Sequence, residues 1–342
     1  MINDDDFHPL RRQRLQDGVK LSGKTSFHSV LLQNFPPFAE FQVSGIFLSQ
    51  GSLPPFWGPT LRGGLGYHLK KTVCHVKQKN CSGCIVQKSC AYSYIFEGVA
   101  PDDRAFMRLY PNIPQPFVIL TSMGAPSQIT AGMEFQFGMR LFGRAIELFP
   151  YIVYSLLEIG KEGLGKDRIP YRIDSITQPA CSSVVYKDGN HCLGGLQKES
   201  VGQVPQHLDS RLTIEFHTPT KLQVGGAQAR KISFLDLIKA VNRRLSILSY
   251  FYGIPFEPSD AFSDDWTGVE SVRVKSDQTR LYEVNRFSGR QQQKMTLRGL
   301  LGRITFEGKV APYIPILKLA EICHVGKATS FGFGRIKLTI QD

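Results

Sequence analysis

Short apolar runs, some of them alternating with polar positions, occur along the first half of the chain. They predict strands at residues 39–48, 117–120, 133–137 and 182–186. Leu61, Leu65 and Leu69 recur every four residues, which predicts a helix capped by Thr60, and a second helix is expected at residues 144–158. The resulting order, strand-helix-strand-strand-helix-strand, is that of one ferredoxin-like βαββαβ unit.

The second half repeats this plan. Strands are expected at residues 212–216, 270–274, 279–287, 303–306 and 335–340, and helices at 233–252 and 314–322. The longer helix opens with a capping box, Ser233-Phe-Leu-Asp236, and stops at Gly253. The polar segment 202–208 separates the halves. We therefore predict an α+β protein with a flexible arm at residues 1–25 and two tandem ferredoxin-like (RRM-like) domains, at residues 26–207 and 208–342, a kind of sheet that commonly binds RNA.

Apolar runs and charge narrow the functional classes. No run approaches the roughly 18 apolar residues of a spanning helix, and the start lacks a secretory signal, so a cytoplasmic protein without a membrane partner is expected. The net charge of +12 favours a polyanion as the binding partner. Nucleic acid is the leading candidate, and the alternatives are a membrane surface or a charge that only keeps the protein soluble. Residues 270–303 alone hold eight basic and three acidic side chains.

Four of the seven cysteines crowd into residues 74–90, at Cys74, Cys81, Cys84 and Cys90. Four thiolates at this spacing can enclose a tetrahedral zinc ion, which would order an insertion at residues 74–100 that is too polar to form a core of its own. An iron–sulfur cluster and four reduced, metal-free thiols are the alternatives. A site closed by four thiolates has no open position for a substrate, so the predicted role is structural. The other three cysteines, at positions 181, 192 and 323, are expected to be packing residues.

The first helix contains the best candidates for acid–base chemistry. His68 lies about 20° around the helix from Leu61, on the edge of the apolar stripe that Lys71 also borders. Metal-free RNA cleavage needs a base for the 2′-hydroxyl group and positive charge beside the phosphorus, which histidine and lysine can supply. The alternative is a hydrogen-bonded histidine at the edge of the core. Arg62 lies on another face of this helix and is predicted to contact RNA.

A glycine-rich segment at residues 324–334 and a basic band are the candidate RNA-binding elements. Glycines allow a backbone to approach a phosphate chain, and neighbouring amide, hydroxyl and ammonium groups can hold it. The segment lacks the spacing of a nucleotide-binding P-loop. The alternative for the segment is an ordinary turn between a helix and a strand, and the alternative for its histidine is a local capping role. The residues predicted to bind RNA here and in the band are His324, Gly326, Lys327, Thr329, Ser330, Gly332, Gly334, Arg286 and Arg290.

Several segments, in this order, resemble one family. They are Leu61-Arg-Gly-Gly-Leu-Gly66, the cysteine cluster with Tyr94-Ile-Phe-Glu97, Phe216-His-Thr-Pro-Thr-Lys221, and His324-Val-Gly-Lys-Ala-Thr-Ser-Phe-Gly-Phe-Gly334. Together they resemble the CRISPR-associated precursor-RNA processing endoribonucleases of the repeat-associated (RAMP) superfamily, from about residue 39 to the end. The resemblance implies two ferredoxin-like domains whose cleft takes the repeat of a CRISPR transcript. It also implies metal-independent cleavage to 2′,3′-cyclic phosphate and 5′-hydroxyl ends, and RNA contacts from the glycine-rich loop.

Family members often use a histidine of the first helix, a position that His68 fits, with Lys71 as the supporting cation. We therefore predict an endoribonuclease that processes precursor crRNA. The main alternative is a subunit that binds crRNA without cutting it, with other CRISPR effector subunits as partners. A zinc-bearing DNA-binding regulator would explain the charge and the cysteines but not the glycine-rich ending.

Overall fold

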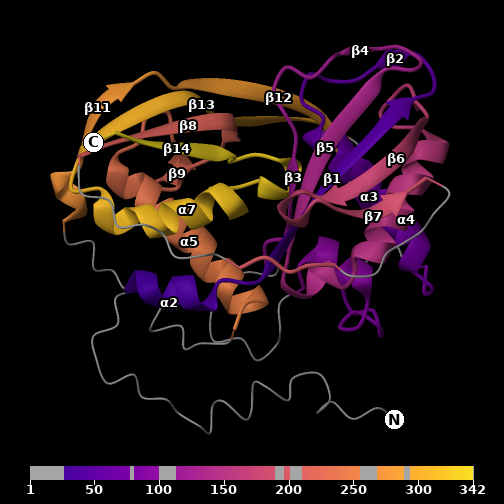
Figure 1. Cartoon of the computed structure of the whole chain (residues 1–342), viewed down its shortest axis with the longest axis horizontal. Coiled ribbons are helices and arrows are strands. Elements are labelled where there is room, and N and C mark those ends of the chain that lie inside the picture. Colours follow the sequence, from indigo (N-terminus) through magenta and orange to yellow (C-terminus); the bar gives the residue numbers. More distant parts are fainter. Residues whose placement is uncertain are drawn as a thin grey trace, which may run out of the picture.

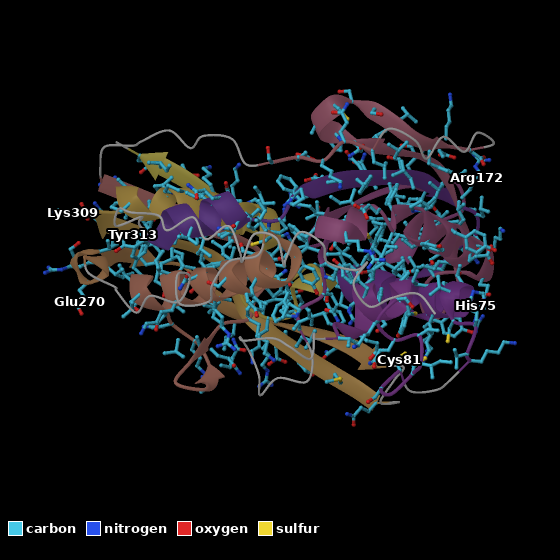
Figure 2. All side chains as sticks on the ribbon, turned by 90° about the horizontal axis from the view of Figure 1, so that it is seen from below. His75, Cys81, Arg172, Glu270, Lys309 and Tyr313 are labelled. Carbon is cyan, nitrogen blue, oxygen red and sulfur yellow. The ribbon has the colours of Figure 1, made fainter. Side chains whose placement is uncertain are left out.

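The structure, a computed structural model, describes residues 27–77, 81–99, 113–188, 196–200, 210–254, 268–288 and 293–341. The predicted arm at residues 1–25, the predicted boundary at 202–208 and Arg290 lie outside these residues. Figure 1 shows two units side by side, each made of an antiparallel sheet with helices on one face. Figure 2, turned by 90°, shows Arg172 on the first unit and Glu270 and Lys309 at the far end of the second.

The first unit has a five-stranded sheet in the order β3-β5-β1-β6-β7. Its strands are β1 (Phe38–Phe47), β3 (Phe117–Leu120), β5 (Glu134–Phe142), β6 (Tyr171–Gln178) and β7 (Ser183–Lys187), and all neighbours pair antiparallel. The helices α3 (Gly58–Val73) and α4 (Phe149–Glu162) pack against each other and against the sheet. A small ribbon of β2 (Gly51–Ser52) and β4 (Gln128–Ile129) lies at one end.

The strand that completes the ferredoxin-like order of this unit is β6, which the sequence pattern did not indicate. The segment predicted at 182–186 is β7, which lies at the edge of the sheet. Alternation along β6 is interrupted, because its pairing with β1 shifts register between Ser44 and Gly45. The first helix begins at Gly58 rather than at the predicted cap Thr60, and Trp57 at its N-cap makes no side-chain capping bond. The predicted helix 144–158 is a short 3₁₀ turn, Gly143–Ile146, followed by α4.

The second unit has the sheet order β11-β13-β8-β14, with β12 paired to β13. Its elements are β8 (Ser210–Thr220), β9 (Gln223–Val224), β10 (Ala227–Gln228), α5 (Phe234–Tyr252), β11 (Arg273–Asp277), β12 (Arg280–Ser288), β13 (Gln293–Gly308), α7 (Ile314–Cys323) and β14 (Ile336–Gln341). The predicted capping box is confirmed: the Asp236 N–H donates to Ser233 Oγ at 3.2 Å, and the Ser233 N–H donates to Asp236 Oδ2 at 2.9 Å. The strand predicted at 303–306 is only the second half of β13.

The strand β3 joins the hydrophobic cores of the two units. Phe117 and Ile119 of β3 face the core of the first unit, whereas Val118 and Leu120 of the same strand belong to the core of the second. All four side chains are buried, which explains the uninterrupted apolar run. The helix α2 (Phe27–Asn34) packs on α5 and α7 of the second unit, although it precedes the first unit in the sequence.

Each unit thus has the antiparallel arrangement of a ferredoxin-like fold, and the prediction of a tandem α+β architecture is confirmed at that level. Among the residues described, none of the helices is long and apolar enough to cross a membrane.

Candidate nucleic-acid interface

The glycine-rich segment 324–334 is a tightly wound loop between α7 and β14. Its backbone takes positive φ at five residues, His324, Gly326, Ala328, Gly332 and Gly334. A side chain at Gly334 would come within 2.0 Å of the Val325 carbonyl oxygen, and one at Gly332 within 2.9 Å of the Ile119 carbonyl oxygen. These two glycines are therefore required by the folding of the loop and by its contact with β3.

Most predicted RNA contacts in this loop point into the protein. Thr329 and Ser330 are only 6% and 4% exposed, and His324 is fully buried. The Nδ1 atom of His324 is 2.9 Å from the Phe333 carbonyl oxygen, and burial lowers the pKa of this ring to about 3. RNA could not reach the His324 ring in this position, so its observed role is to hold the loop. Lys327 is exposed, and its N–H donates to the Lys221 carbonyl oxygen at 3.0 Å.

The loop is seated on α3 of the first unit. Arg62 Nε donates to Ser330 Oγ at 3.3 Å, and the Arg62 guanidinium lies over the rings of Phe331 and Phe96, at 4.3 and 5.2 Å from their centroids. Ser330 Oγ in turn donates to Gln115 Oε1 at 2.8 Å. The structure therefore brings together Arg62 and the glycine-rich loop, which the sequence placed in different domains.

The β12–β13 hairpin lies beside this contact. Val284 of β12 and Leu297 of β13 face each other across the hairpin and pack with Phe56 of the first unit and Phe333 of the loop. The predicted basic band follows these strands. The backbone of Arg286 lies in β12, but its side chain, like all of Arg290, is outside the described residues.

His68 lies at the contact between α3 and α4. Its side chain is 6% exposed, its Nε2 atom is 3.9 Å from Glu162 Oε2, and its Nδ1 atom is buried without a hydrogen-bond partner among the described residues. Lys71 Nζ is 2.6 Å from Glu162 Oε1. Burial lowers the pKa of His68, and the Glu162 carboxylate opposes that change, whereas the bond to Glu162 raises the pKa of Lys71. His68 is therefore neutral near pH 7 and lies beside a fixed cation.

The predicted residues thus form two clusters on one helix. Arg62 and His68 are six positions apart, which is about 9 Å along the axis and about 120° around it. Arg62 meets the loop, and His68 meets Glu162 and Lys71. Sequence reasoning did not identify Glu162, Phe96 or Gln115, because each comes from a distant segment and only the packing of the first unit brings it to α3.

The predicted metal site is not seen as a formed cluster. Within the described part of the chain, no three histidine, cysteine or acidic side chains are arranged to hold a metal ion. The four cysteines are free thiols of intermediate exposure, and burial raises the pKa of Cys81, which also feels Cys74 and Cys90. Figure 2 shows Cys81 and His75 on the segment that follows α3. The donor chemistry suits zinc, but the geometry does not enclose an ion, so zinc stays a prediction.

Comparisons with known proteins agree with this architecture. A family model described as an N-terminal domain, AF_1859_N, matches residues 35–200, and the model of the CRISPR-associated endoribonuclease Cas6 matches residues 214–336. An uncharacterized protein of Archaeoglobus fulgidus is 25% identical over 296 residues, which cover 86% of this chain and 95% of the relative.

Two solved structures share the fold. A Thermus thermophilus Cas6 in a product complex has a TM-score of 0.51 and 15% identity, with 89% of this chain and 100% of that chain covered. A chain of a partial Cas6-RT-Cas1–Cas2 complex has a TM-score of 0.53 and 12% identity over 90% of this chain. This chain spans 47% of the length of that longer one.

Two ferredoxin-like units in tandem form the fold that this chain shares with the solved Cas6 structure, and here the glycine-rich loop of the second unit is seated on a helix of the first. The Cas6 family model matches the second unit, and the glycine-rich loop lies within the matched residues 214–336. Together with the tandem fold, this match supports a CRISPR-associated, repeat-processing protein.

Proposed function

We propose that this protein is an endoribonuclease that cuts CRISPR repeat RNA without a metal ion. The observation that carries the proposal is the seating of the glycine-rich loop, all of which lies within the Cas6 match, on the helix that also carries His68 and Lys71. In the reaction the 2′-hydroxyl group loses its proton and its oxygen attacks the adjacent phosphorus, while the bond to the 5′ oxygen breaks and that oxygen takes up a proton. The products are a 2′,3′-cyclic phosphate and a 5′-hydroxyl end.

His68 accepts the proton of the 2′-hydroxyl group in this proposal. A neutral imidazole is the form that a general base requires, and the lowered pKa of His68 keeps it neutral. Lys71 stabilises the charge that develops on the phosphorane. The ring is 6% exposed and lies beside the Lys71–Glu162 pair, so the scissile phosphate would compete with Glu162 for Lys71 and open access to the ring.

The RNA would be held around the seated loop. Lys327 is exposed there and Arg62 lies against the loop. Arg286 and Arg290, which the sequence predicts to bind RNA, would add positive charge. The buried members of the predicted set act indirectly, because His324, Thr329, Ser330 and the three glycines fix the shape of the loop that presents Lys327.

The test is single-turnover cleavage of the repeat RNA from the same genome in excess EDTA, beside a copy with one 2′-deoxy substitution at the cut site. A discrete cut that the single substitution abolishes supports attack by the 2′-hydroxyl group. His68→Ala should then lower the rate about 100-fold or more and leave RNA affinity nearly unchanged. An unchanged rate would remove His68 from the mechanism. Assays are kept short, so that the chelator does not extract a structural metal.

The second candidate is a subunit that holds crRNA without cutting it, and the burial of His68 favours it. A ring with Nε2 beside Glu162 and Nδ1 enclosed is also what a structural histidine looks like. Tight binding with no cut in either RNA would support this role. Other CRISPR subunits are proposed as partners, and the Cas6 chain found in a Cas6-RT-Cas1–Cas2 complex is the precedent.

Zinc in the segment from Cys74 to Cys90 is proposed on the donor chemistry alone. Elemental analysis of protein purified without chelator should find one zinc per chain, lost in a Cys81→Ser, Cys84→Ser variant. Absorption near 400 nm, roughly where thiolate-bound iron–sulfur clusters absorb, would replace zinc by such a cluster. A protein without metal would leave four structural thiols.

A further inference from the structure

Gly63 is the one glycine in the described ranges that the fold itself does not require. Every other described glycine has positive φ or would place a Cβ atom within 3.3 Å of a neighbour. At Gly63 the backbone is helical, the residue is exposed, and an added Cβ would meet nothing within 4 Å. Its helical neighbours differ, since a Cβ atom would come within 3.3 Å of Ile159 at Gly64 and within 2.6 Å of the Phe96 ring at Gly66.

A glycine inside a helix is unfavourable relative to alanine, because the unfolded chain loses more backbone freedom there. At Gly64 and Gly66 close packing compensates for that loss, but no contact within the protein does so at Gly63. A molecule that binds directly against the helix backbone at this position would explain why glycine occupies it. The surface above Gly63 is open to such a molecule, since even the ring of Tyr67, one turn away, stays beyond 4 Å.

The residues along the same strip of α3 suit a nucleotide. Tyr67 and Lys71 follow Gly63 at intervals of four, so the three share one face of the helix. Tyr67 is 62% exposed, and the Lys71 side chain is 59% exposed. At the other end of the strip, Arg62 is fixed against Phe331 of the glycine-rich loop. An exposed ring for stacking, cations for phosphate and a bare backbone for close approach are the elements of a single-stranded nucleic-acid subsite.

We propose that the strip formed by Gly63, Tyr67 and Lys71 is a nucleotide subsite for single-stranded RNA. The ribose-phosphate lies against the helix backbone at Gly63, a base stacks on Tyr67, and Lys71 faces a phosphate. The identity of the ligand rests on the proposed function, whereas the open backbone position is independent of whether the RNA is cut.

The test uses two substitutions that improve the helix and fill the open space, Gly63→Ala and Gly63→Leu. Both replace glycine by a good helix former, so the melting temperature should rise by about 2 °C. Affinity for a fluorescently labelled repeat RNA should fall, roughly tenfold for leucine and less for alanine, because the added atoms overpack the contact. Tyr67→Ala should also weaken binding about tenfold, and Tyr67→Phe should preserve it.

Gly132 provides the control. It is exposed, has nothing within 4 Å of an added Cβ atom and has a φ of +80°, so Gly132→Ala should lower stability and leave RNA affinity unchanged. A gain in stability at Gly63 with wild-type affinity would overturn the subsite, as would an equal loss of affinity in Gly132→Ala. A wild-type protein that binds the repeat without cutting it overturns the cleavage proposal alone, because the comparison of affinities still holds. A wild-type protein that binds no RNA overturns both.

Discussion

His324 shows how one buried side chain can fix a loop. It follows the last residue of α7 with a φ of +62°, and its Nδ1 atom is 2.9 Å from the carbonyl oxygen of Phe333 at the other end of the loop. The neutral ring donates that bond, because a protonated imidazole would be a buried charge, and Arg140 and Arg244 also act to lower its pKa. Loop shape therefore depends on a histidine that stays neutral.

This dependence predicts an acid sensitivity of the fold. The pKa of His324 is lowered from 6.5 to about 3 in the folded protein, so the unfolded chain binds a proton more readily below pH 6.5. The stability contributed by the neutral ring is complete above pH 6.5 and is lost as the pH falls toward 3. His324→Asn should reduce the stability difference between pH 7 and pH 4.5, measured by urea unfolding. Asparagine tolerates positive φ and can donate to Phe333 without titrating. Parallel pH curves for the two proteins would contradict the assignment.

Glu162 provides a second prediction at the residue scale. Its carboxylate raises the pKa of His68, and Lys71, which it binds, lowers that pKa. In Glu162→Gln the carboxylate no longer raises the His68 pKa, whereas Lys71 still lowers it, so the His68 pKa should fall. The acidic limb of the single-turnover pH–rate profile should therefore move to lower pH. Glu147→Gln, in an exposed pair with Lys198, is the control and should leave the profile in place. An unmoved profile in Glu162→Gln would mean that His68 is not the base.

At the scale of single elements, α5 depends on its capping box. Ser233 and Asp236 satisfy each other's backbone N–H groups at the start of a helix that carries much of the second core. Ser233→Ala should lower the free energy of unfolding by about 1 kcal/mol, because one N–H group loses its acceptor. Chemical denaturation measures this loss, and Ser233→Thr should restore most of it. Equal losses in both variants would assign the effect to packing instead of capping.

The same elements show what could be predicted from the sequence. The capping box and the regular leucines of α3 are local signals, and both correspond to helices in the structure. The strand β6 escaped prediction because its register shift against β1 breaks the alternation that marks a strand. The first half of β13 was missed because it belongs to the hairpin at the junction of the units, where burial depends on Phe56 and Phe333.

At the scale of the whole molecule, Arg140 joins the two units. This β5 residue binds the Glu40 carboxylate on β1 through Nε and Nη2, and its Nη1 atom donates to the carbonyl oxygens of Glu321 and Ile322 at the end of α7. Its side chain is 14% exposed. A mostly buried guanidinium thus satisfies an acid in one unit and the end of a helix in the other.

This link, together with the shared strand β3, predicts that both units unfold in one transition. Scanning calorimetry should show a single peak. Arg140→Ala should lower stability by about 3 kcal/mol, because Glu40 and the α7 carbonyl groups lose a partner, but should leave the peak single. The control is Arg172→Ala, which removes an exposed pair with Asp174 and should change little. Two separated peaks in the wild-type protein would contradict the shared core.

The candidate site could be predicted only in part, because some of its residues lie where the two units meet. Helical periodicity places His68 near Lys71, and both do lie beside Glu162. The burial of Ser330 could not be inferred from the loop, because Arg62 and Gln115, which contact it, come from the other unit. Residues at a junction of domains take their exposure from the partner domain, and a local pattern does not contain that information.

The position of α2 has a consequence for synthesis on the ribosome. This helix precedes the first unit in the sequence, yet it packs on α5 and α7, and α7 ends only at Cys323. Leu31 is fully buried in the finished protein. The nascent helix therefore lacks its partners while the whole first unit is translated. Its apolar face is fully covered only when both α5 and α7 have left the exit tunnel, so an early-translated helix completes its packing late.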